Sequence, residues 1–374
     1  MRWEVKPLGE LCSIQNGFAF KSKLFGDDGM PLIRIRDLSN GFETQTRYSG
    51  EYDENFVVNA GDVLVGMDGE FRCYEWKGEP ALLNQRVCRL EGFDRRLSPR
   101  YTYYGINKYL KAIEEVTSFT TVKHLSAKKI KGIQFPIPPF EEQERIVEVL
   151  DEAFAAIDKA KANIERNLTN ARELFQSRLN DIFSNPSEDW EVKLLGEVCE
   201  NLDSKRVPIT KSKRVSGETP YYGASGVVDW VEGYIFDEDL LLISEDGANL
   251  LARTYPIAFS ISGKTWVNNH AHVLRFENPN HQLWVQYYIN SISVESFVSG
   301  MAQPKLNQKK LNQIPIPVPS LFEQERIVGE LDTLMDMRKN LEVKYQCELD
   351  NLEELRQSIL EQAFEGKLTE PAAA

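Results

Sequence analysis

The chain has 374 residues, of which 42% are hydrophobic and 27% charged, and its formal net charge is −13 at pH 7. This composition allows large buried cores and excludes a disordered or fibrous protein. No stretch approaches the about 18 consecutive apolar residues of a membrane span, and the N-terminus lacks the apolar region of a signal peptide, so we expect a cytoplasmic protein. Five cysteines without a Cys-x-x-Cys pair argue against a disulfide framework.

The sequence contains the same unit twice. Residues 3–12 begin with Trp-Glu-Val-Lys and continue with Leu-Gly-Glu, and residues 190–199 repeat this pattern. A proline-spaced segment followed by Glu-Gln-Glu-Arg-Ile-Val occurs at 135–147 and again at 316–328. A period of about 180 residues is far above that of solenoid repeats, so each unit must bury a core of its own. The duplication predicts an approximate internal two-fold, which suits a symmetric protein pair or a DNA duplex as partner.

The negative charge is unevenly distributed. Residues 1–140 carry 20 Lys and Arg against 18 Asp and Glu, and residues 190–320 carry 12 against 14. Residues 141–189 carry 6 against 12, and residues 321–374 carry 6 against 13. The two globular parts are therefore close to neutral together, and basic clusters on them could still attract phosphate.

In the first globular part, alternating and apolar runs predict a domain dominated by antiparallel strands. Strands are expected at 32–36, 63–65 and 86–90, and a helix at 100–114. A short helix is expected at 126–131 with Ser126 as its N-cap. The prolines that follow predict an extended exit from the domain.

A long helix is predicted from about Glu141 to Phe183, because its apolar residues are alternately three and four positions apart. After it, the second globular part repeats the first. Strands are expected there at 240–243, 257–261 and 272–276, and a helix at 282–291. A short helix is expected at 307–312 with Asn307 as its N-cap. A second long helix is predicted from about Phe322 to Phe364.

At 1.5 Å per residue each long helix would span about 60 to 65 Å. Polar residues interrupt the apolar seam and suggest that the helices also pack on something else; they are Lys161, Arg178, Arg338, Glu342 and Arg356. We predict an α+β fold, with two pseudo-symmetric strand-rich domains separated by two long antiparallel helices that form a coiled coil. The predicted boundaries are 1–140, 141–189, 190–320 and 321–374.

Few residues offer catalytic or metal chemistry. His270 and His272 would point to the same side of a strand, which is a two-ligand spacing for zinc. The first copy places Asn84 and Arg86 at the matching positions, so polar structural or DNA-facing roles are favoured over a metal site. Asp-Gly pairs at 68–69 and 246–247 follow strands, and a turn is favoured over metal ligation there. Phosphate-binding glycine loops, nucleophile elbows and the Asn-Pro-Pro-aromatic signature of DNA methyltransferases do not occur. The sequence predicts a chain without catalytic residues, cofactor or metal.

The remaining chemistry is that of DNA contacts, since Arg and Lys donate to guanine edges or phosphates, Asn pairs with adenine, and aromatic rings contact sugars or thymine methyls. The lysine pairs on the two short helices recur at the same place and are expected to bind phosphate. The candidate DNA-binding residues are Lys21, Arg34, Arg36, Arg72, Arg86, Lys123, Lys128, Lys129, Lys211, Lys213, Arg214, Tyr221, Tyr222, Lys264, Trp266, Asn268, Asn269, Lys309 and Lys310.

Taken together, these motifs resemble the specificity subunits of type I restriction-modification enzymes along essentially the whole chain. The resemblance rests on the repeated opening and proline-rich exits described above. It also rests on Gly-Asp-Val-Leu-Val-Gly-Met-Asp-Gly-Glu at 61–70, on Thr-Pro-Tyr-Tyr-Gly-Ala-Ser-Gly at 219–226, and on Gly-Lys-Thr-Trp-Val-Asn-Asn-His-Ala-His-Val-Leu at 263–274.

The resemblance implies two target recognition domains that each read one half of a split, asymmetric DNA sequence with a nonspecific spacer. It implies helices that act as a spacer and dock two copies of the modification subunit, which binds S-adenosylmethionine and methylates adenine. A separate restriction subunit with ATP and Mg²⁺ would complete the complex. A stand-alone DNA-binding regulator and a scaffold without DNA contact are the rival interpretations; co-purification with a larger partner and salt-dependent duplex binding would distinguish them.

Overall fold

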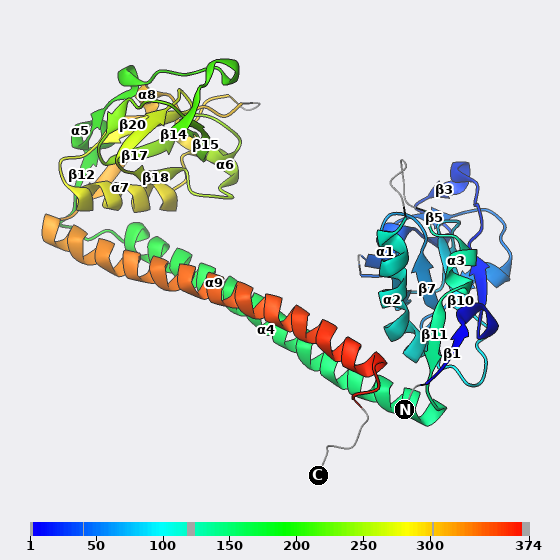
Figure 1. Cartoon of the computed structure of the whole chain (residues 1–374). Helices are drawn as coiled ribbons and strands as arrows, with labels where there is room; N and C mark the ends of the chain where they lie inside the picture. The colour runs from blue at the N-terminus through cyan, green and yellow to red at the C-terminus, as the bar shows by residue number, and fades with distance from the viewer. Residues whose placement is uncertain (1–2, 40, 118–123, 301–302, 369–374) are drawn as a thin grey trace, which may run out of the picture. The chain divides into compact units, whose positions relative to one another are not determined.

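The computed structural model describes residues 3–39, 41–117, 124–300 and 303–368, and Figure 1 shows its elements. The chain divides into two compact units, Met1–Asn163 with Glu348–Ala374, and Ile164–Cys347. Each unit holds one copy of the repeat together with a part of both long helices. No helix in the described ranges is long and apolar enough to cross a membrane.

The first unit contains two sheets and a short ribbon. The ribbon pairs β1 (Glu4–Pro7) with β11 (Gln134–Ile137). One sheet has the order β2 (Ser13–Asn16), β10 (Val87–Glu91), β7 (Val63–Gly66), β8 (Cys73–Glu75), and is antiparallel throughout. The other has the order β3 (Phe25–Gly26), β5 (Arg47–Tyr48), β4 (Met30–Ile33), β9 (Ala81–Leu83), β6 (Val57–Val58), with β4 and β9 parallel. Its helices are α1 (Ile35–Ser39), α2 (Pro99–Glu115) and α3 (Ala127–Lys131).

The second unit repeats this topology. Its ribbon pairs β12 (Glu191–Leu194) with β21 (Pro315–Val318). One sheet has the order β13 (Glu200–Asn201), β20 (Ala271–Arg275), β17 (Leu240–Ser244), β18 (Ala258–Ile261). The other has the order β15 (Gly226–Val231), β14 (Ser216–Gly223), β19 (Lys264–Val267), β16 (Phe236–Asp237), again with one parallel pair, β14 and β19. Its helices are α5 (Leu195–Val198), α6 (Asn249–Ala252), α7 (Pro279–Ser291) and α8 (Gln308–Leu311).

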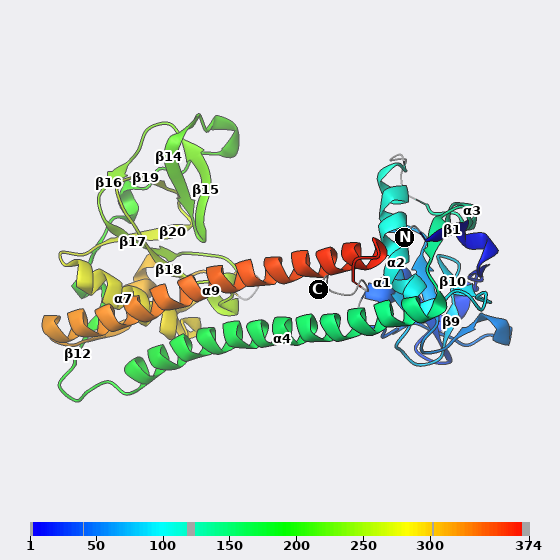
Figure 2. The same cartoon turned by 60° about the horizontal axis from the view of Figure 1, so that its bottom comes forward.

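The long helices are continuous, as predicted: α4 spans Phe140–Ser184 and α9 spans Leu321–Phe364 (Figure 2). In each unit they run antiparallel and bury part of the apolar seam; Leu150, Phe154 and Ile157 are buried in the first unit and Leu331 in the second. The predicted α+β class with two long antiparallel helices is therefore confirmed.

The polar interruptions of the seam have partners on the opposite helix, so an additional partner is not needed to explain them. In the first unit Arg356 lies over the ring of Phe154, 4.2 Å from its centroid, and its Nη1 lies 2.8 Å from Asp158 Oδ1. In the second unit Arg338 lies over the ring of Phe175, and Arg178 donates two hydrogen bonds to Glu330. A guanidinium stacked on an aromatic face can occupy a seam without losing its charge partner.

Each globular part is completed by the far end of the other repeat's helix. Phe364, at the end of α9, packs against Tyr101 and Phe135 with ring centroids 4.9 and 6.4 Å away. Phe183, at the end of α4, packs against Trp284 at 4.9 Å. Trp3 lies against Gly366, where an added Cβ would come within 3.1 Å of its ring.

Three predictions of local structure require correction. The strand expected at 32–36 ends at Ile33, because the Asp37 carboxylate accepts a hydrogen bond from the N–H of Arg34 and α1 begins at Ile35. His270 precedes β20 rather than lying on it. The match of His270 and His272 to Asn84 and Arg86 was wrong by two residues.

The register of the strands gives the correct match. The N–H groups of Met67 and Glu245 donate to the carbonyls of Arg86 and His270, respectively. Two residues further along each strand, Cys88 pairs with Val65 in the first unit and His272 pairs with Ile243 in the second. His270 therefore corresponds to Arg86, and His272 corresponds to Cys88.

Candidate nucleic-acid interface

In the first unit, the Asp-Gly pair that follows β7 lies beside two basic side chains. Asp68 Oδ1 is 2.6 Å from His124 Nδ1, and Asp68 Oδ2 is 3.0 Å from Arg86 Nη1. Gly69 has φ +74°, which glycine adopts without strain, so the chain turns here before β8 as predicted. Helix α3 begins shortly after His124, and Ser126 is its N-cap as predicted, accepting a hydrogen bond from the N–H of Lys129. We call residues 68–69, 86 and 124–131 the first corner.

The second unit has the same arrangement around Asp246, whose carboxylate lies 2.8 Å from His270 Nδ1. Gly247 has φ +111°, although α6 makes this β17–β18 connection longer than a hairpin turn. Asp246 forms an isolated antiparallel β-bridge with Lys305, and Asp68 forms the equivalent β-bridge with His124. Asn307 caps α8 by accepting from the N–H of Lys310. We call residues 246–247, 270 and 305–311 the second corner.

Each corner presents two exposed lysines from its short helix, Lys128 and Lys129 in the first and Lys309 and Lys310 in the second. Lys129 Nζ donates to Thr117 Oγ1 at 3.2 Å. Because the aspartate of each corner already has basic neighbours, the exposed lysines leave a positive surface there. Such a surface attracts phosphate.

The other candidate residues of the first unit lie at several separate places. Lys21 and Arg36 are exposed, and Arg36 Nε lies 3.7 Å from Asp37 Oδ1. Arg34 lies over the ring of Phe25, and Arg72 lies over the ring of Tyr74. Lys123 lies outside the described residues.

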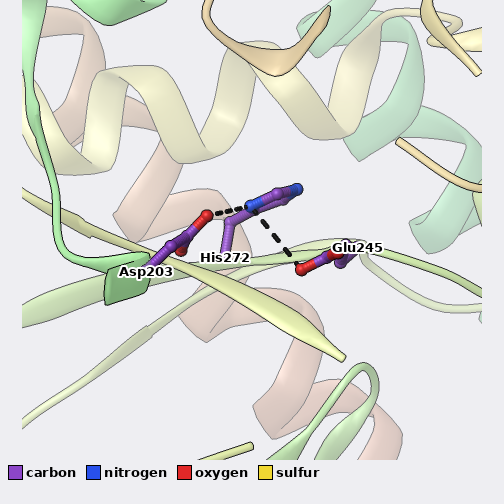
Figure 3. A group of neighbouring side chains, drawn as sticks. All are labelled: Asp203, Glu245 and His272. Carbon is purple, nitrogen blue, oxygen red and sulfur yellow. Dashed lines mark hydrogen bonds and ion pairs between the residues drawn. The ribbon is translucent and has the colours of Figure 1, made fainter. Parts of the chain in front are cut away.

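A buried charged cluster adjoins the second corner, since Glu245 precedes Asp246 and contacts Lys305; Figure 3 shows its three side chains. His272, Asp203 and Glu245 have side chains that are 1%, 7% and 11% exposed. His272 Nδ1 lies 2.6 Å from Asp203 Oδ2, and His272 Nε2 lies 2.7 Å from the carbonyl oxygen of Leu306. Both neighbours accept hydrogen bonds only, so both ring nitrogens must carry a proton.

A doubly protonated imidazole has no lone pair for a metal ion, although this trio has the residue types and the proximity of a metal site. Two further cations reach the same carboxylates: Arg206 Nη1 lies 2.7 Å from Glu245 Oε2, and Lys305 Nζ lies 3.0 Å from Glu245 Oε1. Burial alone would raise the pKa of Asp203, but the hydrogen bond and charge of His272, with the N–H of Val273 and Arg206, hold it below its usual value. The cluster is therefore a structural ion network.

The sequence matches the family described as "Type I restriction modification DNA specificity domain" over residues 1–168 and 187–349. The chain belongs to this family. It is 30% identical to the type I restriction enzyme EcoBI specificity subunit of Escherichia coli over 414 residues, covering 98% of this chain and 86% of that protein. It is 38% identical to a putative type I specificity subunit of Haemophilus influenzae over 156 residues, covering 42% of this chain and 40% of that protein.

Two solved structures share the fold of this specificity subunit. A chain from a study of assembly and conformational transition of the type I restriction-modification system superposes with TM-score 0.74 at 19% identity, covering 98% of both chains. The HsdS subunit from Thermoanaerobacter tengcongensis superposes with TM-score 0.57 at 19% identity, covering 98% of this chain and 97% of that one. Members of the family are non-catalytic DNA-recognition subunits, and this chain is one of them.

Three of the candidate DNA-binding residues of the specificity subunit maintain its own structure. Tyr221 is 1% exposed, and its hydroxyl accepts a hydrogen bond from the N–H of Ile209. Arg214 lies over the Tyr221 ring at 4.4 Å and donates to Asp229 Oδ2. Trp266 Nε1 donates to the carbonyl of Val207 at 2.7 Å. These contacts hold the segment before β14 in place; Tyr221 is buried, whereas Arg214 and Trp266 are half-buried.

The remaining candidates of the second unit differ in exposure. Lys211, Lys213 and Asn269 are exposed, Lys264 lies over the Tyr234 ring at 4.8 Å, and Tyr222 is half-buried next to Phe259. Asn268 is buried. The sequence analysis did not predict that Asp246, His270 and Lys305 form one site. The recurrence of Asp-Gly directly after equivalent strands could have indicated it.

Proposed function

We propose that this specificity subunit binds one bipartite, asymmetric double-stranded DNA sequence with a nonspecific spacer. Residues 1–140 would read one half and residues 190–320 the other. The observation that carries this proposal is the pair of corners, which share the backbone bridge of the aspartate, the capped short helix and the two exposed lysines. Two domains that share the same phosphate contacts can position DNA in the same way, while their different neighbouring surfaces contact different bases.

The two parts diverge where base readout would occur. Arg86 of the first corner is replaced by His270 in the second, and the hairpin of β14 (8 residues) and β15 (6 residues) lies where the first unit has only the short pairing of β4 with β5. Arginine favours guanine edges, whereas histidine donates or accepts according to its protonation state. The two half-sequences are therefore expected to differ.

The helices α4 and α9 are proposed as the docking surface for two copies of the modification subunit. They carry the acidic excess of the chain, so DNA would be repelled from them. They also expose large apolar side chains, among them Leu174 at 65%, Phe322 at 78% and Val343 at 73%. S-adenosylmethionine would be held by the modification subunit, and ATP with Mg²⁺ by the restriction subunit, in the cytoplasm.

The test is reconstitution with a cognate modification subunit and S-adenosylmethionine, followed by sequencing of the methylated sites. We expect adenine methylation at a split site, and exchange of residues 1–140 for those of another family member should change one half only. Methylation by the chain alone, or a chimera that loses both halves while folded and partner-bound, would contradict the proposal.

The clamps are tested separately by replacing Lys128 and Lys129 with alanine. Loss of two phosphate contacts should reduce the slope of log affinity against log salt by about one to two, with the preferred sequence unchanged. Replacing Lys108 and Lys111, exposed on α2 of the same unit, removes the same charge and is the matched control. A shift of the methylated sequence would mean that the corner lysines read bases.

A further inference from the structure

A cavity of about 330 Å³ lies beside the second corner, between the β14–β15 hairpin, the segment after β17 and the turn before β20. Its wall includes Gly223, Val228, Asn268 and His270. Its volume lies at the small end of the range for ligand-binding pockets, about 300 to 1,000 Å³, and suits a single base edge better than a whole cofactor.

Asn268 supplies a fixed donor to this cavity. The residue is 6% exposed, and its Oδ1 accepts a hydrogen bond from the N–H of His270 at 2.7 Å. Because an N–H can only donate, this contact determines which end of the amide is oxygen. Within the described part of the chain the Nδ2 group has no hydrogen-bond acceptor, and it is not one of the fully buried unpaired atoms, so it borders the cavity as a donor that a ligand can use.

An apolar group stands next to this donor. A Cβ added to Gly223 would lie 3.0 Å from Val228 Cγ1 and 3.3 Å from Asn268 Nδ2, so both atoms border the same small space. Two further polar pairs of the rim are formed within the chain. Ser225 Oγ bonds to Tyr255 Oη at 3.1 Å, and the Asp246 carboxylate is paired with His270. The cavity therefore offers a donor beside an isopropyl group.

This chemistry selects among the base edges of the major groove. Thymine presents the O4 acceptor beside its C5-methyl group, guanine presents two acceptors without a methyl, and cytosine presents a donor. Adenine would need the bidentate amide contact expected from the sequence, but Asn268 Oδ1 already accepts from the N–H of His270 and keeps only one lone pair, and adenine has no methyl group for Val228 to contact. A donor next to an isopropyl group fits thymine best.

We propose that this cavity reads a thymine of the half-site bound by the second domain, with Asn268 Nδ2 donating to O4 and Val228 packing on the methyl. The inference rests on the proposed DNA-binding function and names its specificity residues. In the first domain, the corresponding Asn84 accepts from the N–H of Gln85, and the backbone at Gly17 lies so close that an added Cβ would be 2.0 Å from the Asn84 carbonyl. Thymine reading by this device is thus specific to the second half-site.

The decisive variant is Asn268→Asp, which keeps the oxygen that accepts from His270 and turns the donor end into an acceptor. We expect the complex with the modification subunit to bind its site about 10- to 100-fold more weakly, as for loss of one base contact. Preference for thymine should disappear at one position of the second half-site only. Asn280→Asp, which introduces the same charge at the start of α7 and outside the cavity wall, should leave affinity and sequence preference unchanged.

The methyl contact is tested by replacing each thymine of the second half-site by deoxyuridine. At the one position read by the cavity, deoxyuridine should weaken binding by the wild-type complex about 3- to 5-fold, which corresponds to one buried methyl group. The same replacement should not change binding by the complex that carries Val228→Ala.

Three results would overturn the proposal: a second half-site without an A·T pair, equal deoxyuridine effects on wild type and Val228→Ala, or Asn268→Asp weakening all DNA sequences equally, as a phosphate contact would. If the wild-type complex shows no sequence-specific binding at all, the proposed function itself fails, which is a distinct outcome.

Discussion

Removing the buried imidazolium of His272 should destabilise the second unit strongly. In His272→Leu the side chain of Asp203 stays buried and loses its closest cation, and the carbonyl of Leu306 loses its donor. Breaking a buried ion pair by removing one partner costs about 3–5 kcal/mol. For a unit of this size each kcal/mol lowers the melting temperature by about 2–4 °C, so we expect a decrease of about 6–20 °C.

His270→Leu is the matched control, because His270 also pairs with an aspartate but has a side chain that is 51% exposed. An exposed pair contributes within about 1 kcal/mol, so its melting temperature should stay close to that of wild type. Calorimetry of the full chain measures both variants. Equal decreases in melting temperature for the two variants would refute the ion-network interpretation. So would a chelator that lowers the melting temperature of the wild-type chain as much as the His272→Leu substitution does.

Three further outcomes are expected. The pKa values of Asp203 and Glu245 lie below their ordinary 3.8 and 4.5, so the stabilisation that these carboxylates contribute is present above the ordinary values and is lost as pH falls through the lowered ones. The free energy of unfolding should therefore decrease below about pH 4, and it should decrease less in His272→Leu. Phe364→Ala should destabilise the first unit by about 2–4 kcal/mol and speed its proteolysis, whereas Leu355→Ala, 48% exposed on the same helix, should not. Four residues inserted in the middle of α4 add about 6 Å and one turn, so the gap in the methylated site should grow by about one or two base pairs; an unchanged gap in an active enzyme would show that α4 does not set the spacing.

The features that the sequence predicted well are those set by neighbouring residues. The side chains of the caps Ser126 and Asn307 each accept from an N–H three positions later, and Ser or Asn at the start of a short helical stretch signals such a cap. The long helices were equally predictable, because their seam repeats over many turns.

The features that the sequence did not predict depend on residues distant along the chain. Asp68 and His124 are 56 positions apart, and Asp203 and His272 are 69 apart. The strand expected at 32–36 is shortened by one hydrogen bond to the Asp37 side chain, and the periodicity of apolar residues carries no information about such a bond. The orientation of the Asn268 amide likewise follows from a single backbone contact in a turn.

The completion of the first globular part by the end of α9 imposes an order on biosynthesis. Residues 164–347 contain everything in the second unit, whereas the first unit is encoded on both sides of them. During translation the second unit can close while Tyr101 and Phe135 still lack Phe364. The first domain to be synthesised is therefore the last to mature, and its unfinished apolar surface is exposed for most of the time the ribosome spends on this chain.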